Sequence, residues 1–475
     1  MKKRFLLGPA GSGKTFQCLA EARACLRESQ RGKPLLFIAP KQATYQLERE
    51  LLSADELVGF SRLHIVSFER LARFVFDKLG LPVPEILSEP ARVMALKALL
   101  LRHQEELSIF SRAARKPGFA AELSNLLREF QEQQLTPTAL RKTIQLCRHP
   151  ELKQKLQDFA LIWENYSAWL TRQSLIDSGD LLESATRLII EQGSALQIEA
   201  IWLDGFAQMT PQERGLFRAI TRKSEAVTIA FCLPGEKLYG SEWQGPWHLV
   251  HQSFLRLRNE LASIGPWEVE VLELSGGKHR FIQSPTLFEL EKGLRNGVPM
   301  LQPAGDGLKI VSCLNVEEEA QLAVDEILRF VRSGGRFREV AVLVRSLDAF
   351  ASPLQRALNR YRIPLFLDRR EPIAHHPISE LTRGAMRLAR HGWNHEDIFR
   401  TLKSGLCQID NADLYWFENC ALSSGWTQED WEQGLALRKP DPSLQSQVAN
   451  IYERLMLPLL PFLKRVTGRV SGIAI

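Results

Sequence analysis

Short apolar runs and helical periodicity alternate along the first 70 residues. Residues 5–7 and 33–40 are runs typical of strands buried on both faces, and residues 65–68 predict a third strand. Between the first two runs, residues 16–26 are good helix formers with apolar positions at helical spacing. The order strand, loop, helix, strand predicts an α/β fold that opens a doubly wound, parallel sheet.

The pattern changes to amphipathic helices from about residue 89 to residue 192. Apolar residues recur at helical spacing over 91–105, 119–134 and 152–173, with no convincing strand between them. Strand-like runs return at 200–204 and 227–232. We interpret 89–192 as a helical insertion, after which the first sheet resumes.

A passage punctuated by glycine and proline, from about residue 235 to residue 307, predicts an irregular connector. A second α/β pattern follows it, with strands expected at 309–312, 340–344 and 364–367 and helices at 317–333 and 350–361. Helices dominate again beyond about residue 377. The last residues, 468–475, show no clear stop signal or finished element.

A complete phosphate-binding loop lies between the first strand and the first helix. Such a loop aims backbone N–H groups and the positive end of the helix dipole at one point, where a triphosphate fits. Its lysine can reach the outer phosphates and its threonine hydroxyl can ligate magnesium. The alternative is a chance glycine-rich turn. The loop residues are Gly8, Pro9, Ala10, Gly11, Ser12, Gly13, Lys14 and Thr15.

Composition and charge limit the class of protein. The 475 residues are 45% hydrophobic and 24% charged, which is ordinary for a globular chain of two to four domains. The net charge of +6 is compatible with a polyanionic partner and is equally common in proteins without one. Seven scattered cysteines predict reduced thiols, and no run is long enough for a signal peptide or a membrane span. We therefore expect a soluble, cytoplasmic protein.

Asp204 ends an apolar strand and is the candidate magnesium ligand of a nucleotide hydrolase. An aspartate in this place can equally be a turn or helix cap. The residue that would orient the attacking water is missing, because Gly205 follows directly. Gln208 or Glu213 could substitute, although Thr210 and Glu213 have the spacing of a helix capping box.

Lys41, Gln42 and Tyr45 follow the second strand, at the edge of the sheet where ligands bind. They could contact a nucleic-acid strand by charge, hydrogen bond and stacking. The alternative is an ordinary turn followed by a surface helix. Arg345 ends a predicted buried strand and could meet either a phosphate held between two domains or a structural carboxylate. Residues 177–182 read as a capped helix start, with Asp177 or Ser178 as the cap.

Taken together, these segments resemble the UvrD/RecB-type superfamily-one helicases, and most closely the AddB/RexB-type subunits of bacterial helicase-nuclease complexes. The resemblance covers nearly the whole chain in order and spacing, although only the phosphate-binding loop is specific by itself. It rests on residues 8–15, on 39–44, on the Asp-x-x-Asp-Leu-Leu element at 177–182, on Trp-Leu-Asp-Gly-Phe at 202–206, and on 340–377, which contains Val-Leu-Val-Arg.

The resemblance implies two RecA-like P-loop domains with parallel sheets and large helical insertions. The expected boundaries are 1–88 and 193–280 for the two parts of the first RecA-like domain, 89–192 for its helical insertion, 281–304 for a connector, 305–378 for part of the second RecA-like domain, and 379–475 for an incomplete helical insertion.

The resemblance also implies ATP and Mg²⁺ as cofactors. Carried onto matching positions, Lys14 would bind phosphate, Thr15 and Asp204 would bind the metal, and Arg345 would reach the γ-phosphate from the second domain. Three departures from an active motor stand out: Gly205 replaces a glutamate, nothing before Phe5 forms an adenine-binding glutamine segment, and no Gly-Asp-x-x-Gln-x-Ile-Tyr-like element follows residue 232. These three departures imply that the chain keeps an ATP-binding site but is not an active motor.

The expected function is that of an AddB-like subunit in the processing of DNA double-strand breaks for recombinational repair. It would hold double-strand ends and single strands while an AddA-like partner in a heterodimer supplies translocation. The AddB-type nuclease with its iron–sulfur cysteines is not visible, so we expect an N-terminal portion of a longer protein. Two alternatives stay open: a working helicase that uses Gln208 or Glu213, and a P-loop scaffold whose helical insertions bind protein.

Overall fold

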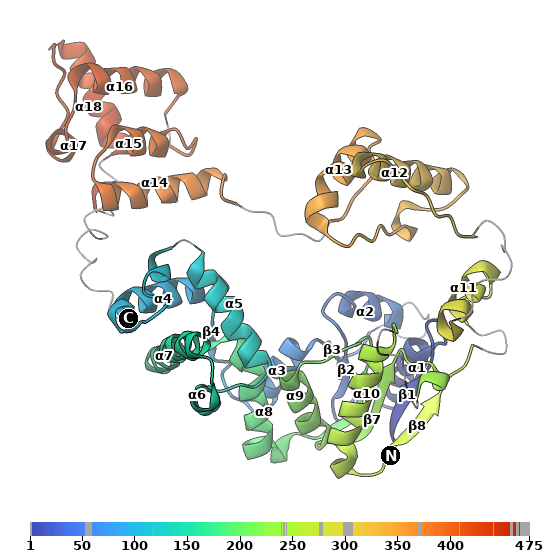
Figure 1. The fold of residues 1–475 in the computed structure, drawn as a ribbon. Coiled ribbons are helices and arrows are strands. Elements are labelled where there is room, and N and C mark those ends of the chain that lie inside the picture. The colour runs from blue at the N-terminus through green and yellow to red at the C-terminus, as the bar shows by residue number, and fades with distance from the viewer. Residues whose placement is uncertain are drawn as a thin grey trace. The chain divides into compact units, whose positions relative to one another are not determined.

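The computed structural model describes residues 2–52, 59–116, 118–238, 240, 243, 245–274, 279–297, 307–367, 373–407, 409–439, 441–456, 459–461 and 465. The chain divides into two units, Met1–Lys309 and Ile310–Ala474 (Figure 1). Gly276, Gly277 and Gly305 of the passage rich in glycine and proline, and the chain end at 468–475, lie outside the described residues.

A six-stranded parallel sheet forms the centre of the first unit. Its order is β3-β2-β6-β7-β1-β8, and every neighbouring pair is parallel. Strands β6 and β7 pair with β2 and β1, which confirms that the sheet resumes after the helical segment. The strands are β1 (Lys3–Leu7), β2 (Leu35–Ile38), β3 (Leu63–Val66), β6 (Ile198–Leu203), β7 (Ser224–Phe231) and β8 (Glu268–Val271).

Helices cover both faces of this sheet, which explains why its inner strands read as continuous apolar runs. Phe5 and Leu7 point into one core, whereas Leu6 between them points into the other. The first core is closed by α3 (Phe68–Lys78), α8 (Leu181–Gln192), α9 (Pro211–Thr221) and α10 (His248–Leu261), and the second by α1 (Lys14–Glu28) and α2 (Thr44–Leu52).

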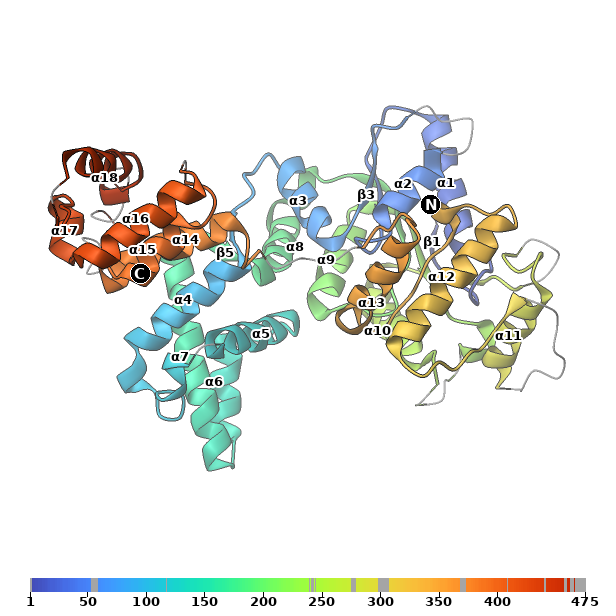
Figure 2. The same ribbon diagram turned by 90° about the horizontal axis from the view of Figure 1, so that it is seen from above.

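Four helices between β3 and β6 pack around a core of their own, and Figure 2 shows them grouped together. They are α4 (Glu89–Arg102), α5 (Phe119–Glu132), α6 (Pro137–Leu146) and α7 (Pro150–Gln173). Helix α8 instead contributes Leu181, Ala185 and Ile189 to the core of the sheet. The expected boundaries of the domains stay predictions.

Two short strands, β4 (Glu85–Leu87) and β5 (Leu175–Asp177), pair in parallel on either side of this helical segment. The sequence pattern predicts neither of these strands, and it does not indicate β8 or α6 either. Buried charges join the helical segment to β5, because Arg92 Nη1 lies 3.0 Å from Asp177 Oδ1 and neither side chain is exposed to solvent. Tyr166 also donates a hydrogen bond to Asp177.

The expectation that Asp177 or Ser178 caps a helix is wrong for Asp177. Its carboxylate accepts from Arg92 and Tyr166, and it makes no side-chain capping bond to the helical turn that follows. The physical reason is that a fully buried guanidinium needs an anion, and this requirement outweighs a cap worth about 1 kcal/mol.

The second unit contains seven described helices in two hydrophobic clusters. Helices α12 (Val316–Arg332) and α13 (Leu347–Arg360) share one cluster. The helices after residue 376 share the other, and they are α14 (Pro377–His391), α15 (His395–Leu402), α16 (Asn411–Ser424), α17 (Gln428–Gln433) and α18 (Pro442–Leu455). Helix α11 (Pro285–Asn296) belongs to the first unit.

The strands expected at 309–312, 340–344 and 364–367 are not formed by the described residues of this segment. Ile310, Leu343 and Phe366 are 92%, 91% and 90% exposed. A strand needs hydrogen-bonded neighbours and cover on both faces, whereas within these three runs only the half-buried Val340 packs against the cluster of α12 and α13. The described residues therefore form one six-stranded sheet and no second sheet of that kind.

Within the described part of the chain, no helix is both long and apolar enough to cross a membrane. All seven cysteines are free thiols, as the scattered spacing predicted.

Candidate nucleotide-binding site

The glycine-rich loop joins β1 to α1, and three of its glycines are required by geometry. Gly11 and Gly13 have φ of 77° and 91°, a region that side chains disfavour. A Cβ on Gly8 would lie 2.6 Å from the Leu272 carbonyl oxygen. Gly13 is also the N-cap residue directly before α1, so the free amides of the first helical turn point at the loop.

The side chain of Lys14 points back into the glycine-rich loop. Its Nζ donates to the carbonyl oxygens of Gly8 at 2.8 Å and Pro9 at 2.7 Å, and to Ser12 Oγ at 3.3 Å. Burial lowers the pKa of the Lys14 ammonium, and the charge of Arg280 acts in the same direction. The ammonium therefore has neutral partners that an anion could replace.

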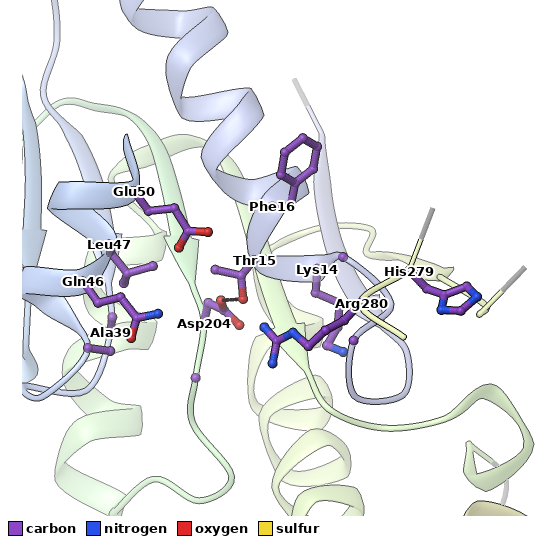
Figure 3. Close-up of a pocket in the computed structure, with 14 residues that line it drawn as sticks. Lys14, Thr15, Phe16, Ala39, Gln46, Leu47, Glu50, Asp204, His279 and Arg280 are labelled. Atoms are coloured by element: carbon purple, nitrogen blue, oxygen red, sulfur yellow. Dashed lines mark hydrogen bonds between the residues drawn. The ribbon is translucent and has the colours of Figure 1, made fainter. Parts of the chain in front are cut away.

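Thr15 and Asp204 meet across the end of the sheet, as Figure 3 shows. Thr15 Oγ1 donates to Asp204 Oδ2 at 2.5 Å, and Asp204 follows directly after β6. Burial raises the pKa of the Asp204 carboxyl, while hydrogen bonds from Thr15 and Gly205 and the charge of Lys14 oppose that rise. A hydroxyl and a carboxylate in contact are the two oxygen ligands that Mg²⁺ uses in P-loop sites.

A segment after β8 lies against the loop from the other side. The backbone N–H of Arg280 donates to the Gly11 carbonyl at 3.1 Å, and the side chains of His279 and Arg280 line the same cavity as Lys14. Arg280 is not among the site residues predicted from the sequence. The available signal was the basic run that ends in Arg280, shortly after the unrecognised strand β8.

The cavity of about 710 Å³ opens between α1, α2 and the 279–280 segment. Phe16, which is 68% exposed, forms part of its rim, and Gln46 and Glu50 of α2 line the opposite wall in Figure 3. A cavity of this size accommodates a nucleotide-sized ligand.

The donor set fits a magnesium-bound triphosphate. The cradle leaves no room for a Cβ at Gly8, the cations of Lys14 and Arg280 face the cavity, and Thr15 with Asp204 offers oxygen ligands for a metal.

Comparison with known proteins identifies the family of this chain. The family described as "ADDB, N-terminal" matches residues 5–291, which include the loop, Asp204 and Arg280. The chain belongs to the AddB N-terminal family.

Three relatives of this AddB-family chain are each named as a subunit of an ATP-dependent helicase/deoxyribonuclease. The protein of Natranaerobius thermophilus is 32% identical over 454 residues, that of Moorella thermoacetica 33% over 442, and that of Desulforudis audaxviator 32% over 494. The matches cover 91%, 91% and 98% of this chain, and 38%, 38% and 42% of those relatives. The chain therefore spans about two fifths of the length of these relatives.

The predicted capping box of the AddB-family chain is confirmed. Thr210 accepts from the Glu213 backbone, and Glu213 accepts from the Thr210 backbone at 2.8 Å. The Glu213 carboxylate therefore forms part of the N-terminal cap of α9. Gln208 is exposed and is not among the residues that line the cavity.

The remaining candidates stay predictions. Lys41, Gln42 and Tyr45 are exposed on the loop after β2 and at the start of α2, at the same edge of the sheet as Asp204. Arg345 is exposed and belongs to the second unit, whereas Lys14 belongs to the first.

Proposed function

We propose that this AddB-family chain is the ATP-binding N-terminal part of a helicase-nuclease subunit that processes DNA double-strand breaks for recombinational repair. The observation that carries the proposal is the buried Lys14 ammonium in a glycine cradle, beside the Thr15–Asp204 pair. The names of the relatives, which describe an ATP-dependent helicase/deoxyribonuclease, support the same process.

The phosphates of ATP would replace the carbonyl oxygens that now accept from Lys14. Arg280 would add a second cation from within the same unit, and Thr15 with Asp204 would hold Mg²⁺, which neutralises phosphate charge. Arg345 would reach the γ-phosphate from the second unit. The exposed apolar side chains of Ile310, Leu343 and Phe366 support the proposal that this unit is part of a second RecA-like domain.

Efficient hydrolysis is not part of this proposal. Gly205 occupies the place of a second carboxylate, and its φ of 87° disfavours any residue with a side chain there. A Cβ on Gly205 would also lie 3.0 Å from Pro40 Cδ. The translocating motor would therefore be an AddA-like partner, while this chain holds DNA, with Lys41, Gln42 and Tyr45 as candidate contacts.

Two measurements test the proposal. Titration of a fluorescent ATP analogue into the whole chain with Mg²⁺ should show saturable binding that unlabelled ATP competes away. Steady-state ATPase activity should stay low with and without single-stranded DNA. Strong DNA-stimulated turnover would favour an active helicase instead. A chain that does not bind the analogue, and does not bind DNA in a separate salt-dependent titration, would favour a protein-binding scaffold.

A further inference from the structure

Helices α6 and α7 form a hairpin that extends from the rest of the helical segment, as Figure 2 shows. The two helices pack against each other and are joined by only residues 147–149, and Leu140 and Ile144 are buried in the shared core. Arg141 binds the Glu164 carboxylate through two hydrogen bonds of 2.7 and 2.6 Å, which fasten α6 to α7. A surface presented on this hairpin is therefore preformed, which lowers the entropic cost of binding.

Positive charge is concentrated at this end of the hairpin. Residues 137–157 contain five Lys and Arg residues and one Glu, a net charge of +4 in a chain whose total is +6. Glu164 engages Arg141. The other four cations have no ion pair among the described residues, and they are Lys142, Arg148, Lys153 and Lys155. Lys153 is half-buried and the other three are exposed.

The dimensions of the hairpin decide how it could meet a nucleic acid. With a rise of about 1.5 Å per residue, all four cations lie within roughly 8 Å of the turn along the helix axes. Two helices of about 10 Å diameter side by side span nearly 20 Å, whereas the major groove of DNA is about 12 Å wide. The hairpin end is too broad to enter a groove, so its cations would contact backbone phosphates.

The side chains at this end also distinguish among possible partners. Residues 137–157 contain no Phe, Tyr or Trp, and sites for single strands stack bases on aromatic rings. Leu146 is 82% exposed, but the cations around it are unlike the charge-depleted centre of a protein interface. Duplex DNA, recognised by its phosphates without base contacts, fits this surface best.

We propose that the basic end of the α6–α7 hairpin, comprising Lys142, Arg148, Lys153 and Lys155, is an anchor for the phosphate backbone of duplex DNA. This inference rests on the DNA-binding part of the proposed function. The anchor holds the duplex independently of base sequence. It is distinct from the nucleotide cavity, because none of its four residues lines that cavity.

The test replaces the four cations together by glutamine in the whole chain. Binding of a blunt-ended duplex of mixed sequence is measured by fluorescence anisotropy at several salt concentrations. Each lost phosphate contact lowers the slope of log K against log salt by about 0.9, so loss of all four lowers it by about 3.6. Binding of a labelled ATP analogue and the unfolding midpoint should not change, because none of the four residues lines the cavity or belongs to the hydrophobic core of the helical segment.

A matched variant removes four exposed arginines elsewhere in the first unit by the same change. These are Arg31, Arg218, Arg222 and Arg256. Both variants have the same net charge, so a local anchor requires the hairpin variant to lose much more of the salt slope than the matched variant. Equal slopes in the two variants, or a hairpin variant with the parent slope, would overturn the inference while leaving the proposed function standing. A parent chain that binds no duplex at all would contradict the DNA-binding proposal itself.

Discussion

Replacing Lys14 by methionine should change ligand affinity and stability in opposite directions. Methionine keeps most of the aliphatic length of lysine but removes the ammonium that we propose to contact phosphate. In the absence of nucleotide that ammonium is buried and bonded only to neutral oxygens, namely those of Gly8, Pro9 and Ser12. The same substitution therefore removes a ligand contact and relieves the burial of a charge.

The loss of affinity follows from the strength of a charge-assisted hydrogen bond. Such a bond is worth about 1.5–3 kcal/mol, which corresponds to a weakening of ATP binding by about 10- to 150-fold. The stability effect has the other sign. Burial lowers the folded-state pKa of Lys14, so the folded chain releases this proton more readily than the unfolded chain does. Stability thus increases as pH rises through the folded pKa, and at neutral pH the buried ammonium is destabilising.

Two assays on the same preparation separate the effects. Titration with a fluorescent ATP analogue measures affinity, and thermal unfolding without nucleotide measures stability, with Lys439→Met on the exposed surface of the second unit as the matched change. We expect weak binding and a melting temperature no lower than that of the parent. Unchanged affinity would refute the role of Lys14, and a lower melting temperature without ligand would refute the argument from its burial.

Three further substitutions test other parts of the reasoning. Gly205→Glu should cost about 1–2 kcal/mol because of the positive φ at this position, and ATPase assays should show no gain in turnover; a gain would contradict the idea that the backbone excludes a second carboxylate. Asp177→Asn leaves the fully buried guanidinium of Arg92 without its anion and should lower the free energy of unfolding by about 3–5 kcal/mol in urea, whereas a loss under about 1 kcal/mol would mean that the pair is not effectively buried. Burial raises the pKa of Asp180 to about 6, so the folded state holds this proton more tightly than the unfolded state does. The free energy of unfolding therefore falls as pH rises from about 4 to about 6, and Asp180→Asn should flatten that part of the stability profile. A profile that the substitution leaves unaltered would exclude Asp180 as the source of the fall.

The loop and all strands of the central sheet except β8 were predictable because each depends on a local pattern. Phe5, Leu6 and Leu7 form an apolar run that needs cover on both faces, and the loop that follows has glycines where its backbone turns. The capping box of Thr210 and Glu213 is likewise complete within four residues. In each case the interacting groups are close neighbours in the sequence.

The missed and overpredicted elements depend on partners far away in the chain. Strand β5 pairs with β4 about 90 residues earlier, and three residues carry too short a pattern to recognise. Arg280 enters the site because β8 pairs with β1, more than 260 residues apart. Conversely, residues 340–344 have the composition of a buried strand, yet Leu343 is exposed among the described residues. Strand composition expresses a preference, whereas strand formation requires a neighbour.

The conformation at Gly205 bears on why a nucleotide site would persist without a motor. A change from Asp-Gly to Asp-Glu is a single substitution, so a missing carboxylate alone would be easy to restore. Here the backbone has a φ of 87°, and a Cβ would press against the ring of Pro40 at 3.0 Å. Restoring the carboxylate would require the backbone after β6 to change as well, and that backbone leads directly into the capped start of α9. Binding groups and hydrolytic groups are therefore separable in the proposed site: the cradle, Thr15 and Asp204 would hold a nucleotide, while Gly205 has a turn conformation that disfavours a second carboxylate.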